Sequence, residues 1–465
     1  MGYTEIAASI VPTDRQVKWN CMEFYGFIHF GLYTFAPDRE GKTGAEIFNP
    51  EKLDAGQWVR AMKAAGMTGV ILTCKHHEGF CLWPSRYTDF SVKNSPWKAG
   101  EGDVVKEVAE ACRIENIKFG VYLSPWDMRE ATYGTKEYNR FFLNQLEELL
   151  TGYGDIFCVW FDGACRETQK IQEYDWEAYY ALIRRLQPEA CISICGPDVR
   201  WCGNEAGICR EEEWSVVPAD IMTTERNPGY WRKIDEIPNS TWKDIGSRDF
   251  IRAYPELIWY PAEVDVSIRP SWGYIPGEDA KLLTLSKLTE IYESSVGGNA
   301  TLLLNVPPNP DGLFDGADVE RLKELGSELT RIYSKPQGKG AAAWSEDSAN
   351  GYDVQSVLNA NRKEYWRSVE TDTELQVVIK LPEERMINLI TIKEAIEIGQ
   401  HIEMFNLDIW NGEDWETVYT GKTIGYKKIC RFPAARTKQI RLFISQYRCF
   451  AALSEIGLYY DSEKE

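Results

Sequence analysis

The feature that most constrains the fold is a regular alternation of apolar runs and amphipathic segments up to about residue 335. Eight apolar, β-branched or aromatic runs have the length of buried strands: 25–30, 69–75, 119–124, 156–162, 191–195, 214–217, 257–266 and 301–306. Helical spacing of apolar residues occurs between them, at 54–65, 103–115, 136–150, 176–186, 280–294 and 319–333. This alternation is typical of a parallel sheet, and eight units predict an α/β fold, a (β/α)8-like barrel with one or two helices missing or irregular.

The pattern changes at residues 334–340, a polar stretch that contains Pro and Gly. Short alternating runs follow at 374–379, 389–392, 407–410, 439–444 and 452–459, separated by turn-forming residues. Such spacing is typical of an antiparallel β-sandwich. We therefore expect two domains, a barrel at 1–337 and an all-β sandwich at 338–465.

Charge and hydropathy exclude two classes of partner. The chain has 71 acidic and 52 basic residues and a net charge of −19, which repels phosphate backbones, so no nucleic acid partner is expected. No window reaches the roughly 18 apolar residues of a membrane span, and the N-terminus lacks the pattern of a signal peptide. We expect a soluble chain, periplasmic or secreted if a signal peptide has been removed. The sequence predicts no oligomeric state.

The twelve cysteines do not form a disulfide or zinc pattern. Cys74, Cys158, Cys191 and Cys195 lie in or beside apolar runs, and no Cys-x-x-Cys pair occurs. They are interpreted as small buried hydrophobic residues. No metal and no cofactor are expected.

Asp162 ends the apolar run 156–161 and is followed by Gly163. A carboxylate at the carboxyl end of a barrel strand is a candidate nucleophile or base, because catalytic groups of such barrels lie on that face. A turn or N-cap aspartate is the structural alternative.

Three of the four histidines lie at the ends of the first two predicted strands: His29, His76 and His77. A metal site is one explanation, but adjacent His76 and His77 point in different directions on a strand, and no further ligand motif accompanies them. Hydrogen-bonded core histidines are another. The third is a rim of neutral imidazoles that bind sugar hydroxyls, since each ring offers one donor and one acceptor. The 17 Trp and 24 Tyr residues favour carbohydrate, because flat rings stack on sugars.

Several motifs in order resemble glycoside hydrolase family 29, the α-L-fucosidases. They are His-Phe-Gly at 29–31, Lys-His-His-Glu-Gly-Phe at 75–80, Leu-Trp-Pro-Ser at 82–85, Val-Trp-Phe-Asp-Gly at 159–163 and Leu-Leu-Asn-Val-Pro-Pro at 303–308. The resemblance spans roughly residues 15–335. It implies a hydrolase whose substrate is a fucosylated oligosaccharide or glycoconjugate.

The resemblance also implies roles for individual residues. Asp162 matches the nucleophile of the family, and Glu205, within 201–207, resembles the acid/base of the branch that cleaves α-1,3- and α-1,4-linked fucose. The segment 259–270 strengthens that assignment. Glu211, Glu212 and Glu213 compete for the same role, although three consecutive acids are typical of a solvated face. The implied substrate contacts are His29, His76, His77, Tyr122, Trp160 and Arg269, with Trp272 near the fucose methyl group.

Two carboxyl groups suit glycoside cleavage, because one stabilises or captures the anomeric carbon while the other protonates the leaving oxygen. We expect double displacement with retention and carboxyl groups about 5 to 5.5 Å apart. Two alternatives stay open: another retaining exo-glycosidase such as an α-galactosidase, and a glycan-binding barrel with little activity.

The C-terminal sandwich resembles discoidin-like carbohydrate-binding modules. Its aromatic residues either bind glycan or fill the core: Trp344, Tyr365, Trp366, Trp410 and Trp415. Core packing is also an alternative for Trp160 and Trp272 in the barrel.

Overall fold

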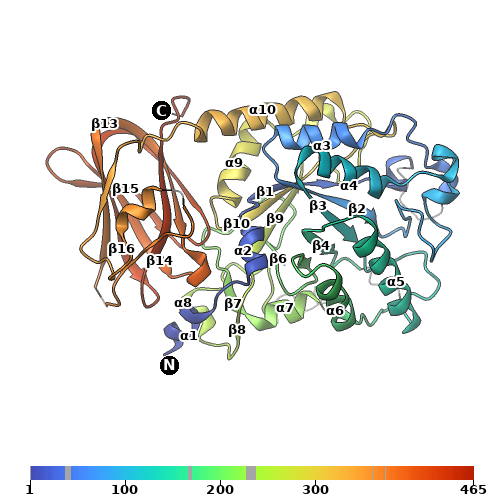
Figure 1. The fold of residues 1–465 in the computed structure, drawn as a ribbon, viewed down its shortest axis with the longest axis horizontal. Helices are drawn as coiled ribbons and strands as arrows, with labels where there is room; N and C mark the ends of the chain where they lie inside the picture. Colours follow the sequence, from blue (N-terminus) through green and yellow to red (C-terminus); the bar gives the residue numbers. More distant parts are fainter. Residues whose placement is uncertain are drawn as a thin grey trace.

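The computed structural model describes residues 2–36, 43–165, 170–226, 237–359, 361–371 and 373–464. It consists of a parallel barrel followed by an antiparallel sandwich (Figure 1). The barrel strands are β1 (Phe24–Ile28), β2 (Gly69–Lys75), β3 (Lys118–Leu123), β4 (Cys158–Phe161), β5 (Cys191–Ile194), β6 (Arg200–Trp201), β9 (Ala262–Ser267) and β10 (Ala300–Asn305). Their order is β5-β4-β3-β2-β1-β10-β9-β6, and one parallel bridge between Ser193 and Val199 nearly closes the ring. The predicted fold class is confirmed.

The six predicted helices surround the barrel. They are α3 (Ala55–Ala64), α4 (Val104–Glu115), α5 (Glu137–Gly152), α6 (Trp176–Leu186), α9 (Leu285–Ser295) and α10 (Gly316–Tyr333). Side chains at the N-cap, such as Asp54, Asp103 and Asp175, accept backbone N–H bonds and explain where helices begin. Two short helices, α1 (Tyr3–Ser9) and α2 (Asp14–Asn20), precede the first strand. No helix among the described residues is both long and apolar enough for a membrane crossing.

The sixth predicted strand is wrong. The run at 214–217 contributes to β7 (Val216–Pro218), which pairs with β8 (Leu257–Trp259) in a separate antiparallel pair. The barrel position is taken by the two-residue strand β6, whose Arg and Trp carry no apolar-run signal. The predicted strand 257–266 is likewise two strands, β8 and β9, interrupted at Pro261, which lacks the N–H that a sheet needs. The helices α7 (Ala219–Glu225) and α8 (Arg248–Ile251) lie between β7 and β8 in the chain.

The sandwich strands are β11 (Ala342–Trp344), β12 (Trp366–Arg367), β13 (Leu375–Glu394), β14 (Ile402–Trp410), β15 (Trp415–Lys422), β16 (Lys428–Tyr447) and β17 (Ala452–Tyr459). Their order is β12-β17-β13-β16-β14-β15, with β11 paired to β13. The predicted runs 374–379 and 389–392 lie in one long strand, β13, whose pairing with β16 shifts register between Lys380 and Arg385. Such irregularities bend a strand and allow it to serve both halves of a sandwich.

The sandwich is joined to the barrel by buried and partly buried charged contacts. Glu23, just before β1, accepts from Lys427 Nζ at 2.8 Å and from the Tyr426 hydroxyl at 3.0 Å. The guanidinium of Arg448 lies 4.0 Å from the centre of the Trp214 ring. Polar contacts of this kind have a specific geometry, so they fix the position of the sandwich relative to the barrel.

All twelve cysteines are free thiols. Cys74, Cys158, Cys191 and Cys195 are almost fully buried, as predicted for small hydrophobic residues. These four thiols therefore contribute to packing.

Candidate active site

The predicted site residues converge at the carboxyl ends of the barrel strands. Parallel strands β1 to β4 are neighbours, so the residues that follow them share one rim. His29 follows β1, His76 and His77 follow β2, and Asp162 follows β4. Tyr122 and Trp160 are the penultimate residues of β3 and β4. Glu205 follows β6, and Arg269 and Trp272 follow β9.

The Asp162 carboxylate is held by donors on both oxygens. Its Oδ2 accepts from the Tyr122 hydroxyl at 2.9 Å, and its Oδ1 accepts from the backbone N–H of Ala164 at 2.7 Å. Burial raises the pKa of Tyr122 well above its usual range, and the nearby Asp162 raises it further, so the phenol keeps its proton and donates. His77 Nε2 lies 3.7 Å from Asp162 Oδ2. Asp162 thus forms a turn contact and also presents an oriented carboxylate.

Asp162 and Glu205 line the same cavity, which we name the acidic cavity. Its volume is about 420 Å³, and its lining residues are Trp160, Asp162, Gly163, Ala164, Cys165, Ile194, Trp201, Glu205, Glu225 and Asp265. Glu205 is exposed at the cavity and accepts from Trp272 Nε1 at 2.9 Å. The two acids singled out from sequence are therefore brought together.

Two further acids of this cavity were missed by sequence reasoning. Asp265 accepts from Trp201 Nε1 at 2.8 Å, and burial raises its pKa well above the usual range against that hydrogen bond. Glu225 accepts from the hydroxyls of Ser240 and Tyr260, and burial raises its pKa to about 7. Asp265 could have been found as an acid near a strand end, whereas Glu225 ends α7, outside the barrel strands, and carries no sequence signal.

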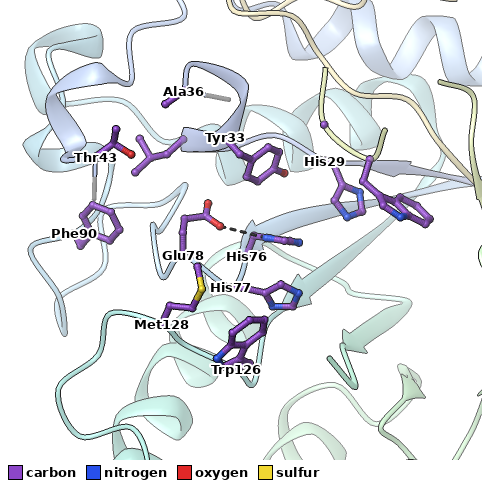
Figure 2. A pocket seen from close by; sticks show the side chains of 13 residues that line it. His29, Tyr33, Ala36, Thr43, His76, His77, Glu78, Phe90, Trp126 and Met128 are labelled. Atoms are coloured by element: carbon purple, nitrogen blue, oxygen red, sulfur yellow. Dashed lines mark hydrogen bonds and ion pairs between the residues drawn. The ribbon is translucent and has the colours of Figure 1, made fainter. Parts of the chain in front are cut away.

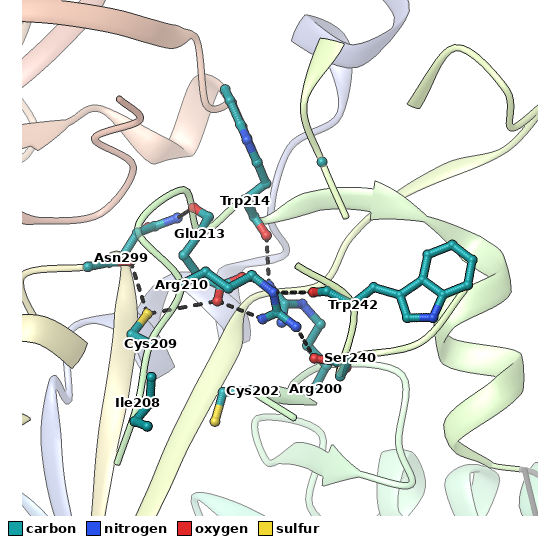
Figure 3. A network of polar contacts seen from close by, with 12 residues as sticks. Arg200, Cys202, Ile208, Cys209, Arg210, Glu213, Trp214, Ser240, Trp242 and Asn299 are labelled. Carbon is teal, nitrogen blue, oxygen red and sulfur yellow. Dashed lines mark hydrogen bonds and ion pairs between the residues drawn. The ribbon is translucent and has the colours of Figure 1, made fainter. Parts of the chain in front are cut away.

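The three consecutive acids do not form one solvated face. Figure 3 shows the Glu213 carboxylate between Arg200 and Arg210. The side chains of Glu213 and of both arginines are largely removed from solvent. Burial opposes ionisation of Glu213, but the two guanidinium groups hold its pKa below the usual value. Glu212 pairs with Lys422 of the sandwich. Of the four candidates for the acid/base role, Glu205 and the three acids at 211–213, Glu205 alone lines the acidic cavity.

The three histidines line a second, adjacent cavity of about 190 Å³, which we name the imidazole cavity (Figure 2). Its other lining residues are Leu32, Tyr33, Ala36, Thr43, Glu78, Phe90, Trp126, Met128, Trp272 and Gly273. The His77 contact with Asp162 and the Trp272 contact with Glu205 connect it to the acidic cavity. The two cavities therefore form one composite site with the acids at their junction.

The imidazoles are oriented by partners on Nδ1. His29 Nδ1 lies 2.9 Å from Asn305 Oδ1, His76 Nδ1 lies 3.2 Å from Glu78 Oε2, and His77 Nδ1 lies 2.7 Å from Ser124 Oγ. Within the described part of the chain, no group of three or more His, Cys, Asp or Glu residues is arranged to hold a metal ion.

Of the predicted substrate contacts, Tyr122 and Arg269 line neither cavity, whereas Trp160 lines the acidic cavity with a largely buried ring. Trp160 is buried, stacks on Tyr122 with ring centres 5.2 Å apart, and donates to Glu263 at 2.7 Å. Arg269 donates through Nε to both oxygens of Asp318 at 3.0 Å and through Nη1 to Asp279 at 2.9 Å. Arg269 lines neither cavity, and its contact with fucose stays a prediction.

Comparison with known proteins identifies the family. The profile of the family described as Alpha-L-fucosidase matches residues 11–335, the part of the chain that carries this composite site. The chain belongs to the α-L-fucosidase family. It is accordingly a glycoside hydrolase of that family, and membership selects fucosidase over the α-galactosidase alternative.

Similarity to individual members of this family extends over 77% to 98% of the chain. It is 39% identical to Alpha-L-fucosidase 1 of Arabidopsis thaliana, over 97% of this chain and 88% of the plant protein. It is similar to the Ruminococcus gnavus GH29 fucosidase solved in complex with fucose, with 30% identity, a TM-score of 0.86, and coverage of 98% of this chain and 96% of that one. The mouse tissue alpha-L-fucosidase is 26% identical over 77% of this chain and 69% of the mouse protein.

Proposed function

We propose that this α-L-fucosidase is a retaining exo-enzyme that removes α-1,3- and α-1,4-linked fucose from branched, Lewis-type glycans. Asp162 is proposed as nucleophile and Glu205 as acid/base. The observation that carries the proposal is that both acids line one cavity, with Asp162 oriented by Tyr122 and by the Ala164 amide.

The proposed chemistry has two steps. An Asp162 oxygen attacks C1 of the fucosyl unit while the bond from C1 to the leaving oxygen breaks and Glu205 gives that oxygen its proton. Glu205 then removes a proton from water, and the resulting hydroxyl oxygen attacks C1 and releases Asp162. Configuration at C1 is inverted twice and hence retained.

The imidazole cavity is proposed to hold the fucosyl unit. It lies next to Asp162 through His77 and combines polar rings with the flat side chains of Trp126 and Trp272. The likeness to a fucosidase solved with fucose supports this assignment. In this arrangement Glu205, bonded to Trp272, lies on the side from which the leaving group departs.

Stereochemistry and chemical rescue test the mechanism. The anomeric form of the first fucose released from an aryl α-fucoside, followed by proton NMR, is expected to be α; initial release of the β form contradicts retention. Asp162→Gly is expected to lose activity and to regain it with azide as β-fucosyl azide, because azide replaces the missing nucleophile. Glu413→Gln, a change in an exposed turn outside both cavities, is the matched control.

Linkage preference is tested separately. Lewis-type trisaccharides and terminal α-1,2-fucosylated glycans are digested in parallel, with Asp162→Asn as the inactive control. Faster release from the branched substrates is expected, and equal or preferential cleavage of the α-1,2 linkage contradicts the proposed branch.

We also propose that the sandwich, taken as residues 338–465, contacts glycan. Trp344 supports this, since 44% of its surface is exposed, whereas Trp366 is fully buried and serves packing. Trp344→Ala is expected to weaken turnover of branched oligosaccharides and leave that of an aryl fucoside unchanged. Unchanged turnover of both substrates contradicts the proposal.

A further inference from the structure

The hydrogen-bond partners of His29 determine which ring nitrogen carries the proton. Asn305 Nδ2 donates to the backbone carbonyl of Trp272 at 2.8 Å and to Ser267 Oγ at 2.9 Å. A carbonyl can only accept, so the amide nitrogen faces Trp272 and the amide oxygen faces His29. That oxygen also accepts the backbone N–H of His29 at 3.2 Å. His29 Nδ1, 2.9 Å away, must therefore be the protonated nitrogen.

The same reasoning applies to His77. The Ser124 hydroxyl donates its one proton to the backbone carbonyl of Trp126 at 2.6 Å. Ser124 Oγ therefore receives the hydrogen bond from His77 Nδ1 at 2.7 Å, and the ring proton lies on Nδ1. Ser124 is fully buried, so solvent does not compete for this contact.

His76 completes the set. Its Nδ1 lies 3.2 Å from Glu78 Oε2, and a carboxylate oxygen accepts. In the neutral ring the Nδ1 proton again faces protein, and Nε2 carries the lone pair. Three partners from different parts of the chain thus impose one tautomer on three histidines.

We infer that Asn305, Glu78 and Ser124 are positioning residues that hold His29, His76 and His77 as Nδ1–H tautomers. The imidazole cavity then presents the Nε2 acceptors of His29 and His76 to the hydroxyls of the sugar, while His77 Nε2 faces Asp162 Oδ2 at 3.7 Å. This inference rests on the proposed function for the identity of the ligand. A glycosidically bound 6-deoxyhexose has three hydroxyls, at C2, C3 and C4, each of which can donate to an acceptor. The class of ligand that fits is a sugar whose hydroxyls act as donors.

Histidine NMR tests the tautomers without any substrate. Protein labelled with ¹⁵N-histidine has only four histidines, and the single variants His29→Gln, His76→Gln and His77→Gln assign the three signals. At a pH well above the ordinary imidazole pKa of about 6.5, each ring is expected to show a protonated Nδ1 and an unprotonated Nε2. His401, with both ring nitrogens near backbone carbonyls, is the internal reference. An Nε2–H tautomer at any of the three positions overturns the inference for the set.

Substitution of Ser124 separates positioning from general stability. Ser124→Ala is expected to give His77 a mixture of tautomers while the signals of His29 and His76 stay unchanged. Ser124→Thr, which keeps the hydroxyl, is expected to restore the single tautomer. The matched control is Ser95→Ala, a buried serine that bonds to its own loop through Val92. Unchanged His77 tautomerism in Ser124→Ala contradicts a positioning role.

Fucose analogues test the direction of the hydrogen bonds. Fluorine accepts weakly and cannot donate, so a site built from acceptors treats a deoxyfluoro sugar like the deoxy sugar. Competitive inhibition by 3- and 4-deoxyfucose and by their deoxyfluoro counterparts is expected to be about tenfold weaker than by fucose for each position, with no advantage for fluorine. Fluoro analogues that bind as well as fucose overturn the inference. Failure of wild-type protein to hydrolyse an aryl fucoside would instead reject the proposed function.

Discussion

Trp160 donates a 2.7 Å hydrogen bond from its indole nitrogen to Glu263, a fully buried carboxyl on β9. The Tyr25 hydroxyl donates to the other oxygen of Glu263. Trp160 lines the acidic cavity and stands two residues before Asp162, so this contact ties β4 to a different strand of the barrel wall beneath the site. Burial raises the pKa of Glu263 to about 7.

Replacement of Glu263 by Gln is expected to change the pH dependence of stability. An unfolded Glu has a pKa of about 4.3, so between that value and about 7 only the folded protein holds the proton. The stability that this proton provides is complete below the unfolded pKa and is lost as the pH rises through the folded pKa. Glu263→Gln should reduce the fall in unfolding free energy between about pH 5 and about pH 8 by about 3 kcal/mol, measured by urea unfolding. Equal falls in variant and wild type, with Glu413→Gln as control, contradict this.

Removal of the Tyr122 hydroxyl is expected to slow catalysis. Tyr122→Phe deletes the 2.9 Å donor to Asp162 Oδ2 while it keeps the ring that stacks on Trp160. A hydrogen bond to a charged group contributes about 1.5 to 3 kcal/mol, so kcat/KM for an aryl fucoside should fall about 10- to 100-fold. Tyr133→Phe is the control, since that hydroxyl bonds to Tyr174 away from both cavities. Equal rates for Tyr122→Phe and wild type would show that this donor does not act on the nucleophile.

Loss of the Lys75 charge is expected to destabilise the loops that carry His77 and Trp126. Lys75 Nζ lies 3.0 Å from Asp127 Oδ2, and both side chains are almost completely buried. Lys75→Met leaves the Asp127 carboxylate without its cation and should lower the unfolding free energy by about 3 to 5 kcal/mol. Addition of Asp127→Asn removes the unpaired charge and keeps the side-chain oxygen that caps nearby amides, so part of the loss should return. A double variant as unstable as the sum of both single changes contradicts this account.

The contact between barrel and sandwich is expected to weaken in acid. Burial opposes ionisation of Glu23, but Lys427 and Lys393 hold its pKa below the usual value. The stability from this charge is therefore present above the unfolded pKa of about 4.3 and is lost as the pH falls through the lower folded pKa. Glu23→Gln should destabilise the protein by about 1 to 3 kcal/mol near neutral pH.

Urea unfolding at neutral and acidic pH checks the Glu23 prediction, because the difference from wild type should shrink in acid. Glu397→Gln, which removes one partner of the more exposed pair with Arg362, should change stability by at most about 1 kcal/mol. A Glu23 variant whose deficit is the same at both pH values would exclude the ionised carboxylate as its cause.

Part of the site was predictable because it depends on local pattern. Apolar runs of strand length end at His29, at Lys75 before the histidine pair, and at Asp162, and parallel strands bring such ends to one rim. The prediction of the sixth barrel strand was wrong because it also relied on local pattern. The true strand, β6, consists only of Arg and Trp, while the apolar β7 packs with Leu257, Trp259 and Ile251 outside the barrel. An apolar run indicates that a segment is buried, but it does not indicate which element the segment packs against.

The sequence by itself determined the barrel, the sandwich and the identity of the side chains at the rim, since strand and helix periodicity follow from neighbouring residues. Only the tertiary structure decided that Glu225 joins the acidic cavity, that Glu213 is buried between two arginines, and which partners orient the imidazoles. Asn305 lies 276 positions from His29, and Ser124 lies 47 positions from His77. The proton on each ring is set by the atom that packs against it, and for His29 and His77 that contact exists only once distant strands have come together.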